Sequence, residues 1–284
     1  MIRRSPSLYA WLEEYGDEFD AVCLDIDGVL LKSGCRLPGS RRLLDYLRQN
    51  GIAFVLLTND GNHATREKAE RLSLAGLDIA PDQIISCGHA IAPQIQSLGM
   101  VGKTFFVMGD TGDPCYVRAA GLEVTRDTGK LKECQGVIIG EEHYEWEPVI
   151  NAIVNYFIDS PLAPLIVPNP DEFYPASKLK IHIASGGIAR FMQHVLKAYG
   201  VDITPIYLGK PYPPIFRMAH SDLERQLGRA LDPDKMLMVG DNLAADIAGA
   251  QSMGYKSALV LTGVSSADAV SHSNFLPDMV FETI

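Results

Sequence analysis

The stretch Cys23-Leu24-Asp25-Ile26-Asp27-Gly28-Val29 decides the fold class and points to the chemistry. An apolar strand, expected over Ala21–Ile26, ends in Asp25 and Asp27, and their i, i+2 spacing predicts that both lie on one face of the strand. Two carboxylates this close repel each other unless a cation or a shared proton lies between them. Gly28 allows a sharp turn that directs backbone N–H groups at an anion. An ordinary strand exit, where Asp and Gly are common, stays open for this stretch alone.

A second acidic pair follows another expected strand, Lys235–Val239. Asp241 comes after Gly240 at the end of this strand, and Asp246 lies five residues later near the start of a helix. Helix capping would explain each acid singly, but not why both acidic clusters follow strands. Carboxylates from two strand ends suit Mg²⁺, a hard ion that prefers oxygen ligands in octahedral geometry.

Two shorter stretches place other polar groups after strands. Thr58 and Asn59 follow a strand expected over Ile52–Leu57, and Lys210 follows one expected over Ile203–Leu208. Taken alone, Lys210 is better explained as a solvated surface amine, and Thr58-Asn59 is a weak signal. Ligands of open parallel sheets bind at the carboxyl ends of the strands, so we expect these groups near the acids.

Short apolar runs alternate with helical stretches along the chain, which predicts an α/β fold with a largely parallel sheet. We expect a core domain over residues 1–86 and 204–284, interrupted by a smaller α/β cap domain over residues 87–203. The other expected core elements are the helices Pro38–Asn50 and Ala64–Ala75 and the strands Lys256–Leu261 and Met279–Phe281. The expected cap elements are the strands Thr104–Met108, Gly136–Ile139 and Ala163–Val167 and the helices Glu147–Phe157 and Gly187–Tyr199.

Composition excludes several classes of protein. A net charge of −10 over 284 residues repels nucleic acid and anionic membranes, so neither is an expected partner. No apolar run approaches the roughly 20 residues of a membrane helix. No apolar region follows the basic start at Met1–Pro6, so we expect no secretory signal. The five cysteines form no CxxC pair, which argues against a disulfide framework and structural zinc and for a cytoplasmic protein. The seven histidines show no metal-ligand spacing.

Together, the four strand ends resemble the motifs of the haloacid dehalogenase-like (HAD) superfamily in order and character. The motifs are Asp25-x-Asp27-Gly28, Thr58-Asn59, Lys210-Pro211 and Gly240-Asp241-x-x-x-x-Asp246. The resemblance implies a Rossmann-like parallel-sheet core with an inserted α/β cap of type IIA. Pro168-Asn169-Pro170-Asp171 in the insertion is similar to the nitrophenylphosphatase, pyridoxal phosphatase and nucleotide monophosphatase branch.

The resemblance implies a hydrolase, namely a Mg²⁺-dependent phosphatase that acts on small phosphorylated metabolites. It implies that Asp25 is the nucleophile that forms an aspartyl-phosphate. Asp27 would be the general acid and base, and Lys210 would hold the nucleophile and the phosphate together. The phosphate-binding residues would be Gly28, Thr58, Asn59 and Lys210. The metal would be held by Asp25, the backbone carbonyl of Asp27, Asp241 and Asp246.

Two departures from the branch leave the substrate open. Relatives carry a Pro-Gly-x-Gly-like stretch where this chain has Ile183-Ala184-Ser185-Gly186-Gly187, and Asp60 replaces a neutral residue after Asn59. Ser185 either binds a substrate anion at a helix N-terminus or simply starts the helix. Asn169 and Asp171 either face the active site from the cap or form a β-turn.

Alternatives to hydrolysis also stay open. A phosphotransferase or phosphomutase would use the same aspartyl-phosphate, and a catalytically silent binding protein would share the fold. The resemblance also implies a possible homodimer through the cap. The insertion leaves the core after the strand and the helix on either side of Thr58, and it returns before Lys210. We therefore expect it to act as a lid that admits small esters.

Overall fold

The computed structural model describes residues 3–177 and 180–284, which form two compact units. The core unit runs up to Thr58 and resumes over Thr65–Ile85 and Lys210–Ile284. The cap unit contains Asn59–Ala64 and Ser86–Gly209. Met1 and Ile2, which open the basic N-terminal segment, lie outside the described residues.

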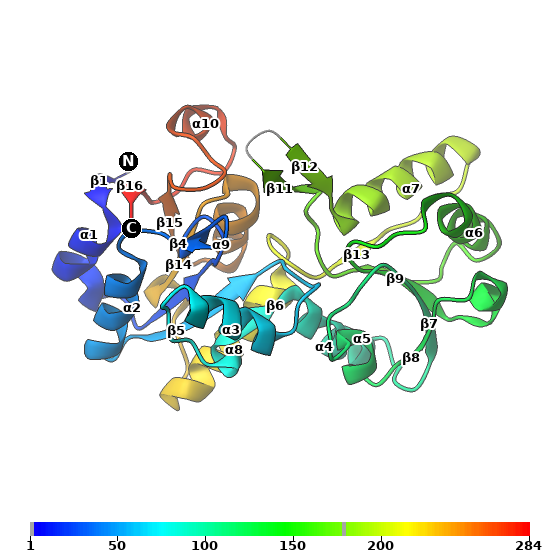
Figure 1. The fold of residues 1–284 in the computed structure, drawn as a ribbon, viewed down its shortest axis with the longest axis horizontal. Helices are drawn as coiled ribbons and strands as arrows, with labels where there is room; N and C mark the ends of the chain where they lie inside the picture. The colour runs from blue at the N-terminus through cyan, green and yellow to red at the C-terminus, as the bar shows by residue number, and fades with distance from the viewer. Residues whose placement is uncertain (1–2, 178–179) are drawn as a thin grey trace. The chain divides into compact units, whose positions relative to one another are not determined.

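The core unit is built on a seven-stranded sheet in the order β1-β16-β15-β14-β2-β5-β6 (Figure 1). Neighbouring strands from β1 to β5 in this order pair in parallel. The first and the last strand of the chain therefore lie together at one edge of the sheet, where β1 pairs with β16. The strands are β1 (Arg3–Ser7), β2 (Ala21–Leu24), β5 (Ala53–Thr58), β6 (Ile84–Ser86), β14 (Met236–Gly240), β15 (Lys256–Val260) and β16 (Met279–Thr283).

Helices cover this sheet with apolar faces. The helix α2 buries Leu43, Leu44 and Leu47, which lie on one face at helical spacing. These side chains pack with residues of α1 and α3 and with alternate residues of β2 and β5 in one hydrophobic cluster. The core helices are α1 (Leu8–Tyr15), α2 (Ser40–Gln49), α3 (Thr65–Leu74), α8 (Pro213–Leu227), α9 (Ala248–Met253) and α10 (Ala267–His272). A short hairpin joins β3 (Leu31–Lys32) to β4 (Cys35–Arg36).

The cap unit is built on a parallel five-stranded sheet in the order β13-β10-β9-β7-β8. The helices α6 and α7 cover one face of this sheet, and α4 and α5 lie on the other (Figure 1). A separate antiparallel hairpin joins β11 to β12. The strands are β7 (Thr104–Met108), β8 (Glu123–Thr125), β9 (Gly136–Ile139), β10 (Leu165–Val167), β11 (Phe173–Ser177), β12 (Lys180–Ile183) and β13 (Ile206–Tyr207). The helices are α4 (Ile91–Ser97), α5 (Tyr116–Ala119), α6 (Trp146–Asp159) and α7 (Ser185–Tyr199).

Two expectations about the strands are wrong. The strand expected over Ile203–Leu208 is only the two-residue β13, and it joins the cap sheet beside β10. The cap unit accordingly extends to Gly209, beyond the expected end at residue 203. The strand β2 ends at Leu24, because the backbone turns and Leu30 N–H donates to the Ile26 carbonyl.

Two further features bear on expectations from composition. All five cysteines are free thiols. Among the described residues, no helix combines the length and the apolar character that crossing a membrane requires.

Candidate active site

The polar motifs of the core unit follow three adjacent strands. The strands β14, β2 and β5 are parallel, and their register pairs Val239 with Leu24 and Leu24 with Leu56. Asp25 follows its paired residue by one position in the sequence, and Thr58 and Asp241 follow theirs by two positions. The register therefore brings these three residues to the same edge of the sheet, as the sequence predicts.

Three carboxylates converge at this edge. Asp25, Asp241 and Asp246 each offer an oxygen, and these oxygens lie within 4.8 Å of one another. The Lys210 ammonium lies 2.8 Å from Asp25 Oδ1 and 2.7 Å from Asp246 Oδ1. The Lys210 side chain is 3% exposed, so the alternative of a solvated surface amine is wrong. When all three acids are ionised, one ammonium leaves two negative charges uncompensated.

Burial of these charges shifts their pKa values. Burial raises the pKa of Asp25 well above its usual range; Lys210 opposes the shift, and Asp246 and Asp241 add to it. Burial and then the charge of Asp246 raise the pKa of Asp241 to about 7. Burial opposes the charge on Lys210, but Asp246 and Asp25 outweigh it and raise the Lys210 pKa. The raised pKa values of Asp25 and Asp241 mean that their charged forms are poorly compensated, so a further cation would stabilise those forms.

Asp246 also fixes the backbone that carries Asp241. It lies in a π-helical turn, η6 (Leu243–Ile247), and is fully buried. Its Oδ2 accepts hydrogen bonds from Asp241 N–H at 3.1 Å and Asn242 N–H at 3.0 Å, while its Oδ1 accepts from Lys210. Asp246 thus positions both the Asp241 turn and the Lys210 ammonium.

Glycines leave room for Asp241. Gly28 has φ +84°, which favours glycine, and a Cβ there would lie 2.2 Å from Asp241 Oδ2. Gly263 approaches even more closely, because a Cβ there would lie 1.7 Å from the same oxygen. Neither position can accept a side chain without moving the carboxylate.

The loop that contains Gly263 was missed by the sequence reasoning. Val264 N–H donates to Asp241 Oδ2 at 2.7 Å, and Thr262 Oγ1 donates to the Gly28 carbonyl at 2.5 Å. This loop thereby ties the Asp241 turn to the Asp25 turn. A signal was present, since Thr262-Gly263 follows the expected strand Lys256–Leu261 closely, as the other motifs follow their strands.

Asp27 differs from the other acids. Its side chain is exposed and does not belong to the close group of carboxylate oxygens found in the described part of the chain. The expectation that Asp25 and Asp27 share one face of a strand is wrong, because β2 ends before both of them. Thr58, by contrast, is the last residue of β5 and is buried.

The remaining motif residues lie in the cap unit. Asn59 Nδ2 donates to Asp171 Oδ2 at 3.2 Å, and Asp171 N–H donates to Asn169 Oδ1 at 2.9 Å. The second bond is the side-chain turn expected of an Asn-Pro-Asp sequence. Ser185 opens α7, which confirms that the segment starts a helix.

The donor set of the core site fits a divalent metal. All three close side chains offer carboxylate oxygens, and their charge exceeds that of Lys210. Oxygen-only donors select hard cations such as Mg²⁺. The backbone around Asp241 is fixed by Asp246 and by Val264, so the site is formed without large rearrangement.

Comparison with known proteins places the chain in a family. A family model described as haloacid dehalogenase-like hydrolase matches residues 22–123, and one described as HAD-hydrolase-like matches residues 207–284. The chain is 30% identical to a dihydroxyacetone phosphatase of Corynebacterium glutamicum, covering 92% of this chain and 87% of the relative. It is 28% identical to the ribonucleotide monophosphatase NagD of Escherichia coli, covering 93% and 96%.

A solved structure agrees with this relationship over the whole chain. The protein from Cytophaga hutchinsonii, described as a possible sugar phosphatase of the HAD superfamily, matches with a TM-score of 0.82 and 27% identity. The match covers 100% of this chain and 98% of that one, so it includes core and cap alike. The chain therefore belongs to the haloacid dehalogenase-like hydrolases, in the subfamily IIA branch that carries an inserted α/β cap.

Proposed function

We propose that the chain is a Mg²⁺-dependent phosphoric monoester hydrolase that acts on small molecules through an aspartyl-phosphate on Asp25. The convergence of Asp25, Asp241 and Asp246 around Lys210 carries this proposal. Phosphoryl transfer requires a positioned nucleophile and neutralisation of charge on the phosphate, and this cluster offers groups for both. Relatives named as phosphatases, such as those of C. glutamicum and E. coli, support it.

Asp25 is the proposed nucleophile. Its side chain is 13% exposed, and Lys210 contacts its Oδ1, which leaves Oδ2 to attack phosphorus. The ester P–O bond breaks as the aspartyl-phosphate forms. Water then attacks the phosphorus, the bond to Asp25 breaks, and inorganic phosphate leaves.

Asp27 is the proposed general acid and base. It protonates the oxygen of the leaving alcohol and then takes a proton from the attacking water. Its exposed side chain suits a group that must meet first the substrate and then water. An acid here also favours phosphate transfer over dehalogenation, since a halide leaves without a proton.

The metal would be held by Asp25, Asp241, Asp246 and the backbone carbonyl of Asp27. When bound, Mg²⁺ would neutralise charge on the phosphate and orient it toward the nucleophile. Thr58, Asn59 and the backbone N–H groups near Gly28 would grip the phosphate oxygens. Gly28 suits this role because its positive φ turns the backbone sharply beside Asp241.

We also propose that the cap unit selects small substrates. The chain crosses between the two units four times; it first enters the cap directly after Thr58 and finally re-enters the core at Lys210. The first and the last crossing therefore lie at residues assigned to phosphate binding. A lid connected there can exclude water once a small ester is bound, whereas a folded phosphoprotein would hold it open. The cytoplasmic location and the homodimer remain predictions.

The test is release of inorganic phosphate from nitrophenyl phosphate with and without Mg²⁺, with Asp25→Asn beside the wild type. We expect turnover that EDTA abolishes, that Mg²⁺ restores and that Ca²⁺ restores poorly, since calcium prefers more ligands at longer distances. Asp25→Asn should lose about 10⁴-fold or more in kcat while keeping its circular dichroism spectrum. Full activity in EDTA, or a tenth of kcat in Asp25→Asn, would disprove the proposal.

A further inference from the structure

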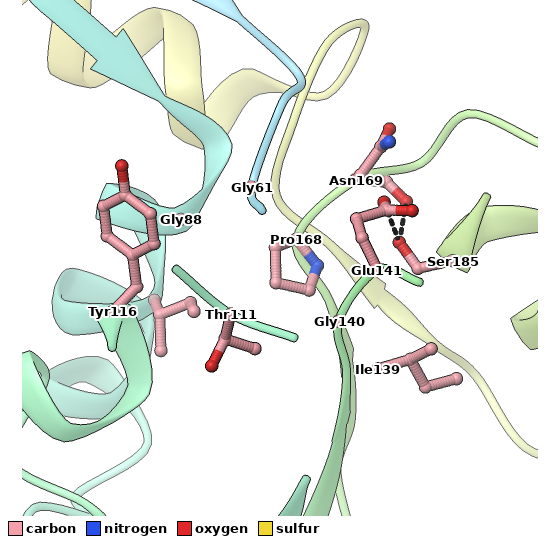
Figure 2. A pocket seen from close by; sticks show the side chains of 11 residues that line it. Gly61, Gly88, Thr111, Tyr116, Ile139, Gly140, Glu141, Pro168, Asn169 and Ser185 are labelled. Atoms are coloured by element: carbon pink, nitrogen blue, oxygen red, sulfur yellow. Dashed lines mark hydrogen bonds between the residues drawn. The ribbon is translucent and has the colours of Figure 1, made fainter. Parts of the chain in front are cut away.

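In the cap unit, buried polar side chains connect the segments that follow its strands (Figure 2). Ser185 Oγ, at the start of α7, donates to Glu141 Oε1 at 2.8 Å and lies 3.0 Å from the Asn169 carbonyl oxygen. These three residues border a small pocket, here called the cap pocket, whose volume of about 10 Å³ holds about one water molecule. No step of the proposed reaction is assigned to them, so we attribute these contacts to the stability of the cap unit.

In the core unit, an exposed lysine forms the comparable connection beside the proposed general acid. Lys32 ends the two-residue strand β3, and its Nζ donates to the Thr262 carbonyl at 2.6 Å. Thr262 opens the loop Thr262–Val264, which follows β15 and donates to Asp241. Lys32 forms no ion pair with an acid in the described part of the chain. Its ammonium therefore connects β3 to this loop and does not balance an acidic side chain.

The hydrogen bonds around Lys32 form a closed circuit. Gly28 N–H donates to the Leu31 carbonyl at 2.7 Å, and Lys32 is the next residue in the chain. Lys32 Nζ bonds to the Thr262 carbonyl, and Thr262 Oγ1 donates to the Gly28 carbonyl at 2.5 Å, which closes the circuit. The circuit thus joins the turn after β2, the strand β3 and the loop after β15.

Asp27 belongs to the turn that this circuit holds. The Ile26 carbonyl accepts hydrogen bonds from Leu30 N–H at 2.8 Å and Leu31 N–H at 2.9 Å. Both backbone groups of Gly28 bond within the circuit, and Leu31 forms a bridge with Asp27 itself. The direction of the Asp27 side chain therefore depends on the geometry of this turn. A general acid acts only within hydrogen-bond reach of the oxygen that it protonates.

The hairpin of β3 and β4 needs such side-chain bonds to stay in place. Each strand has two residues, and only Leu31 of the four is buried. An isolated two-stranded hairpin is marginally stable in water. Arg36, on β4, bonds to the Gly76 carbonyl at 3.3 Å, so the hairpin is held by a cationic side chain on each strand. Of these two side chains, only Lys32 bonds to a loop that contacts the carboxylate cluster.

We propose that Lys32 is a positioning residue: its ammonium holds the Asp27 turn against the Thr262–Val264 loop and so keeps the Asp27 carboxyl directed at the leaving oxygen. This inference rests on the proposed phosphatase function. Asp27 gives its proton to that oxygen as the ester P–O bond breaks. Loss of Lys32 should therefore slow this step most for leaving groups that depend on the proton.

The experiment compares kcat/KM of Lys32→Met and the wild type for phenyl phosphate and nitrophenyl phosphate. These esters differ by one nitro group, which makes nitrophenol the more acidic leaving alcohol. In this account, kcat/KM reports formation of the aspartyl-phosphate, the step in which Asp27 acts as an acid. We expect a loss of about tenfold for phenyl phosphate and of about threefold or less for nitrophenyl phosphate.

Two further variants test the circuit itself. Lys32→Arg keeps a cationic donor and should retain both kcat/KM values within about threefold. Thr262→Val removes the bond to the Gly28 carbonyl and should show the same dependence on the leaving group. The double variant Lys32→Met/Thr262→Val should be little worse than either single variant, because each change already opens the circuit.

Lys235→Met is the matched control. Lys235 Nζ donates to the Glu18 carbonyl at 3.1 Å, an exposed bond of the same kind in the core unit. Lys235 precedes β14, whereas Asp241 follows the other end of that strand. This variant should keep wild-type kcat/KM for both esters, and circular dichroism checks that every variant is folded.

Each outcome decides the inference. A loss for nitrophenyl phosphate equal to or larger than that for phenyl phosphate overturns it, because Lys32 then does not act through proton transfer. Unchanged kinetics in Lys32→Met overturn it too, as do losses that multiply in the double variant. Absence of nitrophenyl phosphate turnover by the wild type defeats the phosphatase proposal itself, and so is distinguishable from failure of the role of Lys32 alone.

Discussion

The core and cap units each bury carboxylates, but they stabilise them in opposite ways. In the core, the buried Lys210 ammonium contacts Asp25 and Asp246, and backbone N–H groups hold Asp246 and Asp241. In the cap, Glu141 has neutral hydrogen-bond donors, and one of its oxygens has no partner among the described residues. The protein itself therefore supplies the groups that hold the core cluster, whereas it leaves one buried oxygen of Glu141 without a donor in the described part of the chain.

The largest expected effect comes from removing the cation of the core cluster. Lys210→Met leaves Asp25 and Asp246 buried without their ammonium, which should cost about 3–5 kcal/mol in the free energy of unfolding. Urea unfolding in metal-free buffer measures this cost. Lys132→Met is the control, because Lys132 and Asp159 form an exposed pair that should contribute at most about 1 kcal/mol. Equal losses in the two variants would show that Lys210 does not stabilise the cluster.

The next largest effect concerns Asp27, the exposed acid that lies outside the carboxylate cluster. Asp27→Asn should lower kcat by about 10²–10⁴-fold, and more for esters of poorly acidic alcohols, which need protonation most. The measurement is kcat for phosphate esters with a series of leaving groups. A loss of the same size for nitrophenyl phosphate and for an alkyl phosphate would remove Asp27 as the general acid.

The raised pKa of Glu141 predicts how the stability of the protein changes with pH. Burial raises the pKa of Glu141 from 4.5 to about 7, so the folded protein holds a proton that the unfolded chain releases. The contribution of this proton to the free energy of unfolding is fully present below about pH 4.5 and is lost as the pH rises through 7. Between pH 5 and 8, the unfolding free energy of the wild type should therefore fall by about 2–3 kcal/mol relative to that of Glu141→Gln. Parallel profiles of unfolding free energy against pH would contradict this.

The smallest effect concerns the loop that holds Asp241. Gly263→Ala should push the Asp241 carboxylate aside, because the new Cβ would lie 1.7 Å from its Oδ2. We expect about a tenfold loss in kcat/KM, of the order that displacing one positioned group produces. Gly129→Ala in the cap is the control, since its nearest atom is the Asp127 side chain at 3.2 Å. Unchanged kinetics and Mg²⁺ dependence in Gly263→Ala would show that the loop does not position Asp241.

The sequence predicts the core site better than the cap pocket, for a physical reason. Strands of a buried parallel sheet are continuous apolar runs, so the polar residues that end them stand out, as Asp25, Thr58 and Asp241 do. The contact between Glu141 and Ser185 spans 44 residues, and nothing local to Glu141 indicates that it is buried. The sequence predicts the strand Ile203–Leu208 at the start of the second core segment, but β13 pairs with β10 of the cap sheet. A short apolar run does not reveal which strand it pairs with.

The central claim is that Asp25 carries the phosphate during turnover. Asp27→Asn slows hydrolysis of the intermediate as well as its formation, and so helps it to accumulate with a good leaving group. The decisive measurement is mass spectrometry of acid-quenched Asp27→Asn protein mixed with nitrophenyl phosphate and Mg²⁺. The account predicts a phosphorylated peptide that contains Asp25. The double variant Asp25→Asn/Asp27→Asn should give no such peptide. Nitrophenol released in an amount equal to the enzyme, with no phosphate on that peptide, would contradict it.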